Sequence, residues 1–385
     1  MMNKTIPKNT LFQTIFSYGF RPFYATAALY VAFIILLWYP LGFQGNPNYP
    51  SFFWHGHEMI WGFTGAIIVG FLLTAVSNWT NTPPVNNYRL LLLFIFWLLA
   101  RIFIYLPFKS SIYLSTLFDT LFYAVTALFI TLALLKSKNY PNILVPFVLL
   151  LFGAINILFC LAMTGTIPVS LLTVMQLGLL GTSAFIGLIG SRVIPFFTSM
   201  TLQQVNQFSK PFTLLAFLLP VIMIILMLLP VPKIFVLIVG IAVMLANGYQ
   251  LCRWWNPRIL KEPLLWSLHA GFFFTTIGIA VLSYAYSINL RYLSLSTHLI
   301  AIGGIGLITL GMMARTALGH TGRRMVLPKG MKYAFLSVLA SILIRILATF
   351  IDNNLYLLIS SAILFSLAFI IYLYRYLPIL LTPSK

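Results

Sequence analysis

The sequence predicts an all-α membrane protein with about twelve transmembrane helices, on the basis of its composition, its low charge and the spacing of its apolar segments. Of the 385 residues, 61% are hydrophobic and 7% are charged, and the mean hydropathy is +1.00. A soluble domain keeps roughly a quarter of its residues charged. Segments of about 20 apolar residues, long enough to span a bilayer, begin near residues 24, 55, 89, 112, 143, 171, 212, 234, 264, 296, 332 and 355.

The connections between these segments are short, polar and rich in Pro, Asn and Lys. None is long enough for a soluble domain, so residues 1–385 are expected to form a single integral membrane domain. The first 23 residues are polar and basic and show no convincing cleavage site. The first segment is therefore interpreted as an uncleaved helix rather than as a removed signal peptide.

The distribution of basic residues predicts the orientation in the membrane. With twelve spans, one side receives both termini and the even-numbered loops, and 18 of the 23 Lys and Arg residues fall on that side. Because cytoplasmic loops carry an excess of Lys and Arg, both termini are expected in the cytoplasm. The net charge of +19 is then explained by contact with anionic lipid headgroups. It is spread over many loops, so nothing indicates nucleic acid as a partner.

Three spans, the second, sixth and tenth, are unusually rich in glycine. Gly62, Ala66 and Gly70 recur at four-residue intervals in the second, a pattern that lets helix backbones approach closely in lipid. The ends of the three spans can be laid over one another, with Arg192 and Arg315 each six residues before a threonine. Recurrence at every fourth helix suggests three four-helix pseudo-repeats around an axis.

The five histidines are the strongest candidates for chemistry, because ionisable groups in membrane spans are costly and usually functional or paired. In the twelve-span arrangement, His55, His57 and His298 lie toward the outer side, whereas His269 and His320 lie toward the cytoplasmic side. His298 alone is equally well explained as a hydrogen-bond donor between helices, and His320 alone as a solvated loop residue. The cluster HGHEM at residues 55–59 is harder to explain as purely structural.

Helix geometry restricts how that cluster can bind a metal. Residues two apart point to nearly opposite faces of a helix, so His55 and His57 cannot share one metal unless the segment is extended at Gly56. Glu58 is a natural acceptor for an imidazole N–H, and the Met59 thioether suits Cu(I). The tryptophans at the ends of this span, Trp54, Trp61 and Trp79, are interpreted as interfacial anchors.

The remaining charged residues leave alternatives open. Arg192 and Arg315, at inner helix ends, either extend to the lipid headgroups or pair with anionic groups of a bound cofactor, such as haem propionates. Asp119 and Asp352 could pair with Arg101 and Arg345, in an order that the sequence does not assign. The two cysteines, at positions 160 and 252, are too far apart to bridge. Because no C-x-x-C-H motif occurs, a covalent c-type haem is excluded.

Several blocks of the sequence closely resemble the NnrS family. These blocks are WHGHEMIWGF followed by GFLLTAVSNWT, then GSRVIPFFT, WSLHAGFFFTTIG and GMMARTALGHTGR, and they include all five histidines. The resemblance covers essentially the whole chain, with Ser77 as a departure where a proline is expected. It implies a twelve-span protein of the bacterial inner membrane that contains haem and copper and acts in the response to nitric oxide and nitrosative stress.

The resemblance and the residue chemistry agree on metal binding, since imidazole suits both iron and copper. The haem is expected to be non-covalent haem b. The outer group of His55, His57 and His298 is expected to form one site, with Met59 as an additional candidate ligand and Glu58 beside it. His269 and His320 are expected to contribute to a second site, and which site holds iron is left open.

Two functional classes follow from these expectations. The first is a metalloprotein that binds, senses or removes NO, or protects cellular iron from it, with an electron donor that the sequence does not identify. The second is a proton-coupled or copper transporter that uses the same histidines. A full haem–copper oxidase or NO reductase core fits less well, because two haems and a copper require six histidine ligands and the chain has five.

Overall fold

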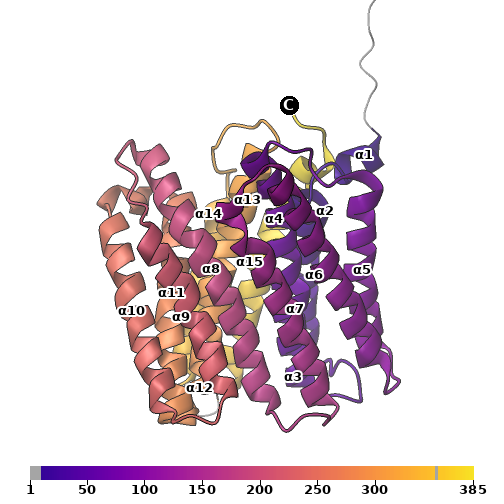
Figure 1. Cartoon of the computed structure of the whole chain (residues 1–385), viewed down its shortest axis with the longest axis vertical. Helices are drawn as coiled ribbons and strands as arrows, with labels where there is room; N and C mark the ends of the chain where they lie inside the picture. Colours follow the sequence, from indigo (N-terminus) through magenta and orange to yellow (C-terminus); the bar gives the residue numbers. More distant parts are fainter. Residues whose placement is uncertain (1–9, 352–353) are drawn as a thin grey trace, which may run out of the picture.

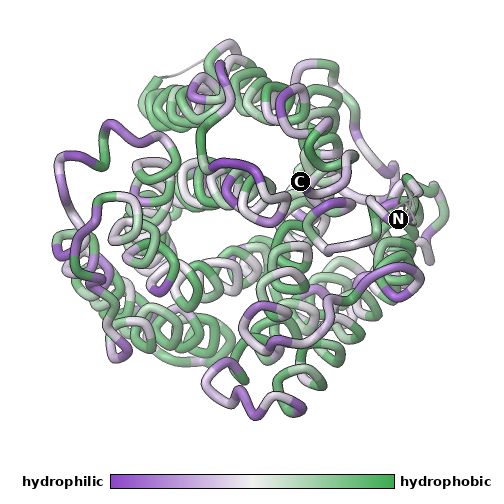
Figure 2. Tube along the Cα trace, turned by 90° about the horizontal axis from the view of Figure 1, so that it is seen from above, coloured by the Kyte–Doolittle hydropathy of each residue, from purple (hydrophilic) through white to green (hydrophobic). Residues whose placement is uncertain are grey.

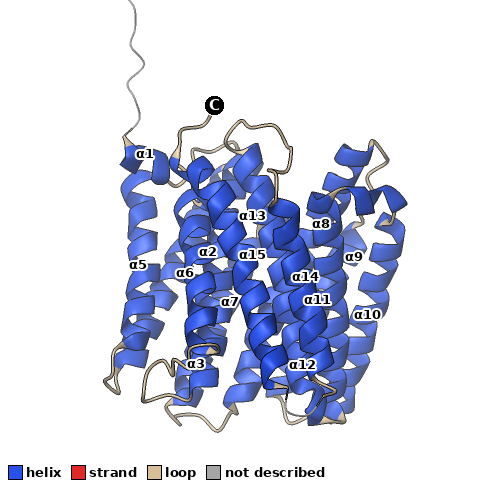
Figure 3. Ribbon diagram, turned by 180° about the vertical axis from the view of Figure 1, so that it is seen from behind, coloured by secondary structure: helices blue, strands red, loops and turns tan. Residues whose placement is uncertain are grey.

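The computed structural model describes residues 10–351 and 354–385, and over this part the chain is a bundle of long helices joined by short connections (Figures 1 and 3). Twelve of its helical segments are long and apolar enough to cross a membrane. The spans are Phe20–Trp38, Ser51–Thr80, Asn87–Tyr105, Ser111–Lys136, Tyr140–Met163, Leu171–Leu202, Lys210–Leu228, Ile234–Trp254, Pro263–Ser287, Leu290–Gly319, Met331–Ala348 and Leu355–Leu381. The prediction of an all-α, twelve-span protein is therefore confirmed.

Nine of these spans contain a single α-helix each and no π-helix. They are α2 (Phe20–Trp38), α5 (Asn87–Tyr105), α6 (Ser111–Lys136), α8 (Leu171–Leu202), α9 (Lys210–Leu228), α10 (Ile234–Trp254), α11 (Pro263–Ser287), α14 (Met331–Ala348) and α15 (Leu355–Leu381). The fifth span joins the 3-10 turn η2 (Tyr140–Asn142) to α7 (Leu144–Met163). A short helix, α1 (Leu11–Ile15), precedes the first span and is capped by Thr10, whose side chain accepts a hydrogen bond from the Gln13 backbone.

The second and tenth spans are each interrupted by a π-helix directly after their histidines. The second span runs through α3 (Ser51–His57), the π-helix η1 (Glu58–Thr64) and α4 (Gly65–Thr80). The tenth runs through η4 (Leu290–Tyr292), α12 (Leu293–His298), the π-helix η5 (Leu299–Gly306) and α13 (Leu307–Gly319). Because π-helices are rare and occur frequently at functional sites, their position beside His57 and His298 draws attention to both segments.

Side chains from neighbouring helices satisfy the carbonyl groups of the first π-helix. Tyr123 donates its hydroxyl to the Trp61 carbonyl at 2.7 Å, and the Trp97 indole donates to the Gly62 carbonyl at 2.9 Å. In the membrane such groups must be satisfied within the protein, since no water is available to bind them. The irregular segment is therefore held by α5 and α6.

The order in which helices neighbour one another repeats three times. One unit comprises α5, α6, α7 and α8, a second comprises α9 to α13, and a third comprises α14, α15, α2 and the second span. Consecutive spans pack on each other within each unit, and the last span of each unit packs on the first two spans of the next. The pattern agrees with the three four-helix units expected from the glycine-rich spans, and those three spans meet pairwise at the centre of the bundle.

The surface of the bundle is apolar along its sides, and hydrophilic residues gather in the connections at its ends (Figure 2). The C-terminus and α1 lie at one end, which we call the terminal face, while α3 and α12 lie at the opposite end, the outer face (Figure 1).

Two tryptophans of the second span lie inside the bundle. Trp54 and Trp61 are 1% and 0% exposed, and the Trp61 indole donates to the Phe152 carbonyl. Their interpretation as interfacial anchors is thus wrong, because both belong to the core.

The two cysteines offer a test of the orientation. Cys252 is exposed, near the end of α10 at the terminal face, whereas Cys160 is buried. Since the basic residues predict that the terminal face is cytoplasmic, a membrane-impermeant maleimide should label Cys252 in inverted vesicles and leave it unlabelled in intact spheroplasts. A Gln44→Cys variant on a Cys252→Ser background, exposed on the connection at the outer face, should show the reverse pattern. Labelling of Cys252 from outside would contradict the orientation.

Candidate metal centres and a buried ion cluster

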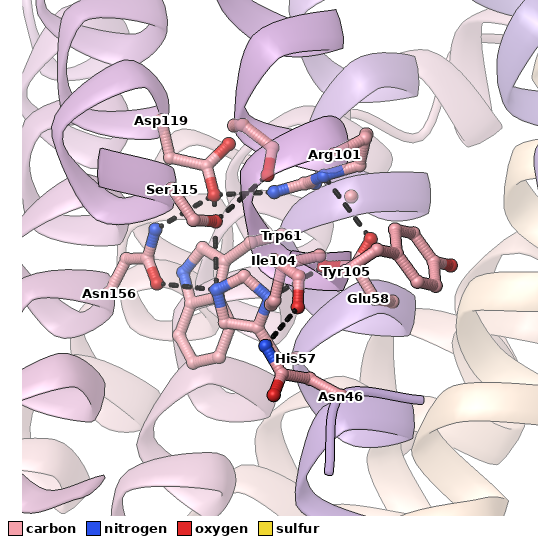
Figure 4. A network of polar contacts seen from close by, with 12 residues as sticks. Asn46, His57, Glu58, Trp61, Arg101, Ile104, Tyr105, Ser115, Asp119 and Asn156 are labelled. Carbon is pink, nitrogen blue, oxygen red and sulfur yellow. Dashed lines mark hydrogen bonds and ion pairs between the residues drawn. The ribbon is translucent and has the colours of Figure 1, made fainter. Parts of the chain in front are cut away.

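A cluster of buried charges lies where the second span meets α5, α6 and α7 (Figure 4). Arg101 is at its centre, with Nη2 2.6 Å from Asp119 Oδ2 and Nε 3.2 Å from Glu58 Oε2. The side chains of Glu58 and Asp119 are completely buried. Gly62 makes room for the guanidinium, because a Cβ at position 62 would lie 2.6 Å from Arg101 Nη1. We call Arg101, Glu58, Asp119, His57 and Asn156 the ion cluster.

Within the ion cluster, His57 faces a hydrogen-bond acceptor at each ring nitrogen. Its Nδ1 lies 2.7 Å from Glu58 Oε1, and its Nε2 lies 2.9 Å from Asn156 Oδ1. The Asn156 amide is oriented by its nitrogen, which donates to Asp119 Oδ2 at 3.1 Å. Both ring nitrogens of His57 therefore have hydrogen-bond partners inside the ion cluster.

Tyrosine hydroxyls complete the cluster on its other side. Tyr30 donates to Glu58 Oε2 and lies 3.1 Å from the Tyr105 hydroxyl. The sequence indicated that Arg101 and Asp119 could pair, and the structure joins them. It gave no reason to include Asn156 and Tyr30, although an asparagine within the apolar run INILF was a visible signal. The other predicted acid, Asp352, lies outside the described residues.

His57 is therefore separated from the outer group in which the sequence analysis placed it. Each of its ring nitrogens already has a hydrogen-bond partner within the ion cluster, so binding a metal would break one of these contacts. The sequence predicted that Glu58 is the hydrogen-bond partner of an imidazole. In the structure that imidazole belongs to His57. Among the described residues, no group of three or more His, Cys, Asp or Glu side chains is arranged to hold a metal ion, so the expected three-histidine site is reduced to His55 and His298.

His55 points to the opposite side of the second span, toward the end of α2. Its ring stacks on Trp38, with ring centroids 3.8 Å apart and planes inclined by 9°. Its Nδ1 is buried and has no hydrogen-bond partner among the described residues. An unsatisfied buried nitrogen costs about 1–3 kcal/mol, so a ligand to this atom would relieve a real penalty.

His298 is the last residue of α12, which lies at the same end of the bundle as the α3 segment that carries His55 (Figure 1). Its Nδ1 is 2.7 Å from the Ser294 carbonyl, one turn earlier on α12. The Nδ1 proton is therefore used, and the lone pair resides on Nε2, which is the tautomer typical of a metal ligand. Both rings are half-buried. We call His55 and His298 the outer pair.

Soft and charged groups surround the outer pair. Met59 packs in the small cluster that contains Trp38, and Met175 of α8 packs against Gly56. The sequence analysis named Met59 but missed Met175, because nothing in the sixth span indicates which of its faces meets α3. Arg345 of α14 donates to Ser294 Oγ at 3.2 Å, and the carbonyl of the same Ser294 holds His298 Nδ1.

His269 lies on α11 and lines a cavity of about 510 Å³ on the side of the bundle. Its Nδ1 is 3.0 Å from the Leu265 carbonyl, which again leaves the lone pair on Nε2. Nε2 is 3.5 Å from the Thr198 hydroxyl, whose proton is already donated to the Ile194 carbonyl at 2.8 Å. The Nε2 lone pair of a 6% exposed imidazole thus receives no strong donor.

The cavity beside His269, which we call the lateral cavity, lies between α10, α11 and α14. Its other walls are apolar, formed by Leu251, Trp255, Ile259, Leu260, Trp266, Ala270, Phe273, Leu336 and Leu339. Leu260, Phe273 and Leu336 are exposed on the flank of the bundle, so the cavity opens sideways. Arg258 and Lys261 of η3 (Pro257–Lys261) flank it at the terminal face.

The two predicted cofactor arginines have different surroundings. Arg315 lies with its guanidinium carbon 3.9 Å from the Phe197 ring centroid, and its Nη1 makes a long 3.4 Å contact with the Leu264 carbonyl. Its buried Nε has no hydrogen-bond partner among the described residues. Arg192 instead donates to Asn142 Oδ1 at 2.7 Å. Arg315 therefore has a buried N–H donor without a partner among the described residues, close to the start of α11. Arg192, in contrast, donates to a side-chain oxygen.

His320 follows α13 at the terminal face and does not join His269. Its ring lies about 6 Å from those of Phe20 and Tyr18, with centroid distances of 5.9 and 6.2 Å. Partial burial lowers the pKa of His320 below its usual value, because desolvation disfavours the charged imidazole. The expected inner pair of His269 and His320 is thus divided between two environments.

A family described as NnrS protein matches residues 14–384, nearly the whole chain. No curated protein matches the sequence. The matched range contains the ion cluster, the outer pair, His269 and His320.

The ion cluster makes a prediction about stability. Replacing Arg101 by Met leaves two buried carboxylates without their guanidinium, and breaking a buried pair in this way costs about 3–5 kcal/mol. We expect Arg101→Met to lower the thermal midpoint of the detergent-solubilised protein strongly, as measured by tryptophan fluorescence. Arg89→Met, at an exposed position, should change the stability by less than about 0.5 kcal/mol.

The same cluster allows an internal control. Neutralising the carboxylates in a Glu58→Gln, Asp119→Asn, Arg101→Met triple variant removes the unpaired charges, so it should be more stable than Arg101→Met alone. A triple variant that is less stable than the single one would show that charge pairing is not what stabilises this region.

Proposed function

Because the chain belongs to the NnrS family, we propose that it is a haem- and copper-binding protein of the bacterial cytoplasmic membrane that binds nitric oxide. The observation that carries the proposal is the His269 imidazole, whose Nδ1 is fixed by the Leu265 carbonyl and whose ring lines the lateral cavity. The family name links the protein to the nitric oxide response. Haem would occupy the lateral cavity and copper the outer pair.

The lateral cavity suits haem b in size, lining and donor. Ligand cavities commonly measure about 300–1,000 Å³ and combine apolar walls with a few polar groups, and this cavity of about 510 Å³ has one imidazole among nine apolar residues. His269 would hold the haem, and the haem iron would supply the chemistry that binds NO. Arg315, Arg258 and Lys261 are the cations on this side of the bundle that could meet the haem propionates.

The protein's own residues would prepare that site in three ways. Leu265 holds the Nδ1 proton and thereby directs the ligand lone pair to Nε2, which also raises the basicity of the ring. Trp254, packed edge-on at 6.4 Å, restricts rotation of the ring. The apolar walls exclude water, so a neutral diatomic ligand meets little competition there.

The outer pair suits copper in its reduced state. It offers two neutral imidazoles with the Met59 and Met175 thioethers nearby, and soft sulfur ligands favour Cu(I). The positive charge of Arg345 opposes any cation, but it opposes a monovalent ion less than a divalent one. The chemistry of these donors, together with the unsatisfied Nδ1 of His55, favours copper over zinc or magnesium here.

Replacement of His269 tests the haem site. The purified protein should show a Soret band that shifts when NO is added, and His269→Gly should lower its haem content roughly tenfold or more, as loss of a ligand weakens binding at least as much as loss of a supporting residue. Imidazole added to the medium should restore the band, because it fills the space of the missing ring. Rescue of this kind distinguishes ligation from general loss of folding.

His320→Gly provides the matched control, since it removes the other histidine of the terminal half. It should leave the haem content unchanged. A colourless wild-type protein would refute the haem proposal and favour the transporter alternative, in which the same histidines carry protons or copper. Equal loss of haem from both variants would contradict a site at His269.

Copper is tested separately by metal analysis of two further variants. His55→Ala and His298→Ala should each lower the copper content while the Soret band is retained, because the outer pair and His269 lie toward opposite faces of the bundle. Met200→Leu, a change at an exposed methionine, serves as control for Met59→Leu, which should weaken copper binding. Loss of both metals from every variant would contradict two separate sites.

A further inference from the structure

A second, smaller cavity lies at the centre of the bundle, where the second, sixth and tenth spans meet. Its volume is about 60 Å³, and we call it the central cavity. The three spans line it with the same spacing, namely positions i, i+3, i+4 and i+7 counted from Thr64, from Thr182 and from Ile305. The cavity therefore follows from the three-unit architecture and not from a local packing fault.

The lining of the central cavity is apolar even where it contains threonine. Thr64, Thr182 and Thr309 donate their hydroxyl protons to carbonyls of their own spans, at Met59, Gly178 and Ile305, over 2.8, 3.1 and 2.7 Å. Each therefore presents mainly its methyl group. A buried water needs two to four polar partners, and cavities without them stay dry. No charged side chain lines the cavity.

The central cavity lies directly beside His269. Leu268 lines the central cavity, while the next residue, His269, lines the lateral cavity. Ile194 also lines the central cavity, and its carbonyl holds the Thr198 hydroxyl that lies 3.5 Å from His269 Nε2. Toward the terminal face the lining becomes more open, because Phe71, Val193 and Met312 are half-buried.

We propose that the central cavity is a binding site for a small apolar gas molecule, which in this protein is nitric oxide on its way to the site at His269. Naming NO rests on the proposed function, whereas the gas site itself rests on the cavity alone. Water occupies about 30 Å³ per molecule in the liquid, so about 60 Å³ holds one or two diatomic molecules. A lipid tail or a porphyrin is far too large, and an ion or a polar metabolite would find no partner.

A gas molecule is stabilised in this site by the dispersion contacts that the lining atoms lack when the cavity is empty. Atoms that line a void lose part of their dispersion energy, and an uncharged gas molecule restores these contacts without displacing water. NO is uncharged and weakly polar, so it concentrates in apolar phases such as the bilayer core. A cavity with an apolar lining in the membrane-embedded centre can therefore take up such a molecule.

Xenon is the probe for this site, because it fills dry apolar cavities and does not react with metals. Crystals of the full-length protein pressurised with xenon should show an anomalous peak between Thr64, Thr182 and Thr309, with or without haem present. Ordered water in the cavity, or no xenon at pressures that fill other apolar cavities, would overturn the proposal.

A filling variant provides the second measurement. Thr309→Leu adds volume inside the central cavity and should abolish the xenon peak. Thr131→Leu is the control, since Thr131 of α6 is likewise bonded to its own helix, at the Ala127 carbonyl, but does not line the cavity. It should keep the xenon peak. Persistence of the peak in Thr309→Leu would place the xenon elsewhere and refute the site.

The link to NO is tested in the haem-loaded protein. Thr309→Leu should slow NO rebinding after flash photolysis while the Soret spectrum and haem content stay as in Thr131→Leu. Unchanged rebinding with a filled cavity would refute the route but leave the haem proposal intact. A protein that binds xenon but no haem would refute the proposed function and leave the gas site intact.

Discussion

The contact between Arg101 and two buried carboxylates is the constraint on which the arrangement of the candidate sites depends. An uncompensated charge inside the bundle would cost several kcal/mol, so Glu58, Asp119, Arg101 and His57 must meet if any of them is to be buried. The contacts among these four side chains fix the rotation of the second span, because they require His57 to face α6 and α7. Residues two apart on a helix point to nearly opposite sides, and His55 is therefore directed toward Trp38 and the tenth span. The ion cluster thus sets the direction of His55, although His55 does not belong to the cluster.

The two π-helices extend this effect along their spans. A π-turn contains an additional residue, so the faces after Glu58 and after Leu299 are rotated relative to those of a regular helix. The carbonyls of Trp61 and Gly62 bond Tyr123 and Trp97 instead of continuing a regular ladder. In the tenth span, glycine allows the irregular segment to lie tightly against α11, since a Cβ at Gly304 would overlap the Thr275 hydroxyl. The sixth span remains a regular α-helix and packs against both π-helices. The histidine-bearing segments α3 and α12 are thereby rotated relative to α4 and α13.

Much of the fold could be predicted from the sequence, because membrane spans depend on local composition. Length and hydropathy set the twelve spans, and the recurrence of glycine-rich spans at every fourth helix suggested three four-helix units. The sites were harder, because they depend on which faces meet. Helical geometry was enough to show that His55 and His57 point in different directions. It did not show that both ring nitrogens of His57 would form hydrogen bonds, with Glu58 and Asn156. The π-helices also change which residues share a helix face, so faces assigned from the regular α-helical repeat are shifted after each of them. Trp54 and Trp61 were misassigned for a related reason: position near the end of a span suggests an interface, whereas a span surrounded by other helices is buried to its end. His269 and His320 are both on the terminal side, but that shared depth does not bring them onto the same helix face.

The distribution of polarity suggests why gas and ions would take different routes through the protein. Three of the charged side chains inside the bundle meet in the ion cluster, where Arg101 pairs with both Glu58 and Asp119. The outer pair lies near one end, and the lateral cavity opens toward the flank near the other. Between them, the three central spans present methyl and phenyl groups to one another. A charged species crossing this region would lose its hydration and gain no partner, at a cost of many kcal/mol. A small uncharged molecule loses almost nothing. The architecture therefore separates species by their hydration as well as by their size, and such a separation is what a membrane site for a lipid-soluble gas requires.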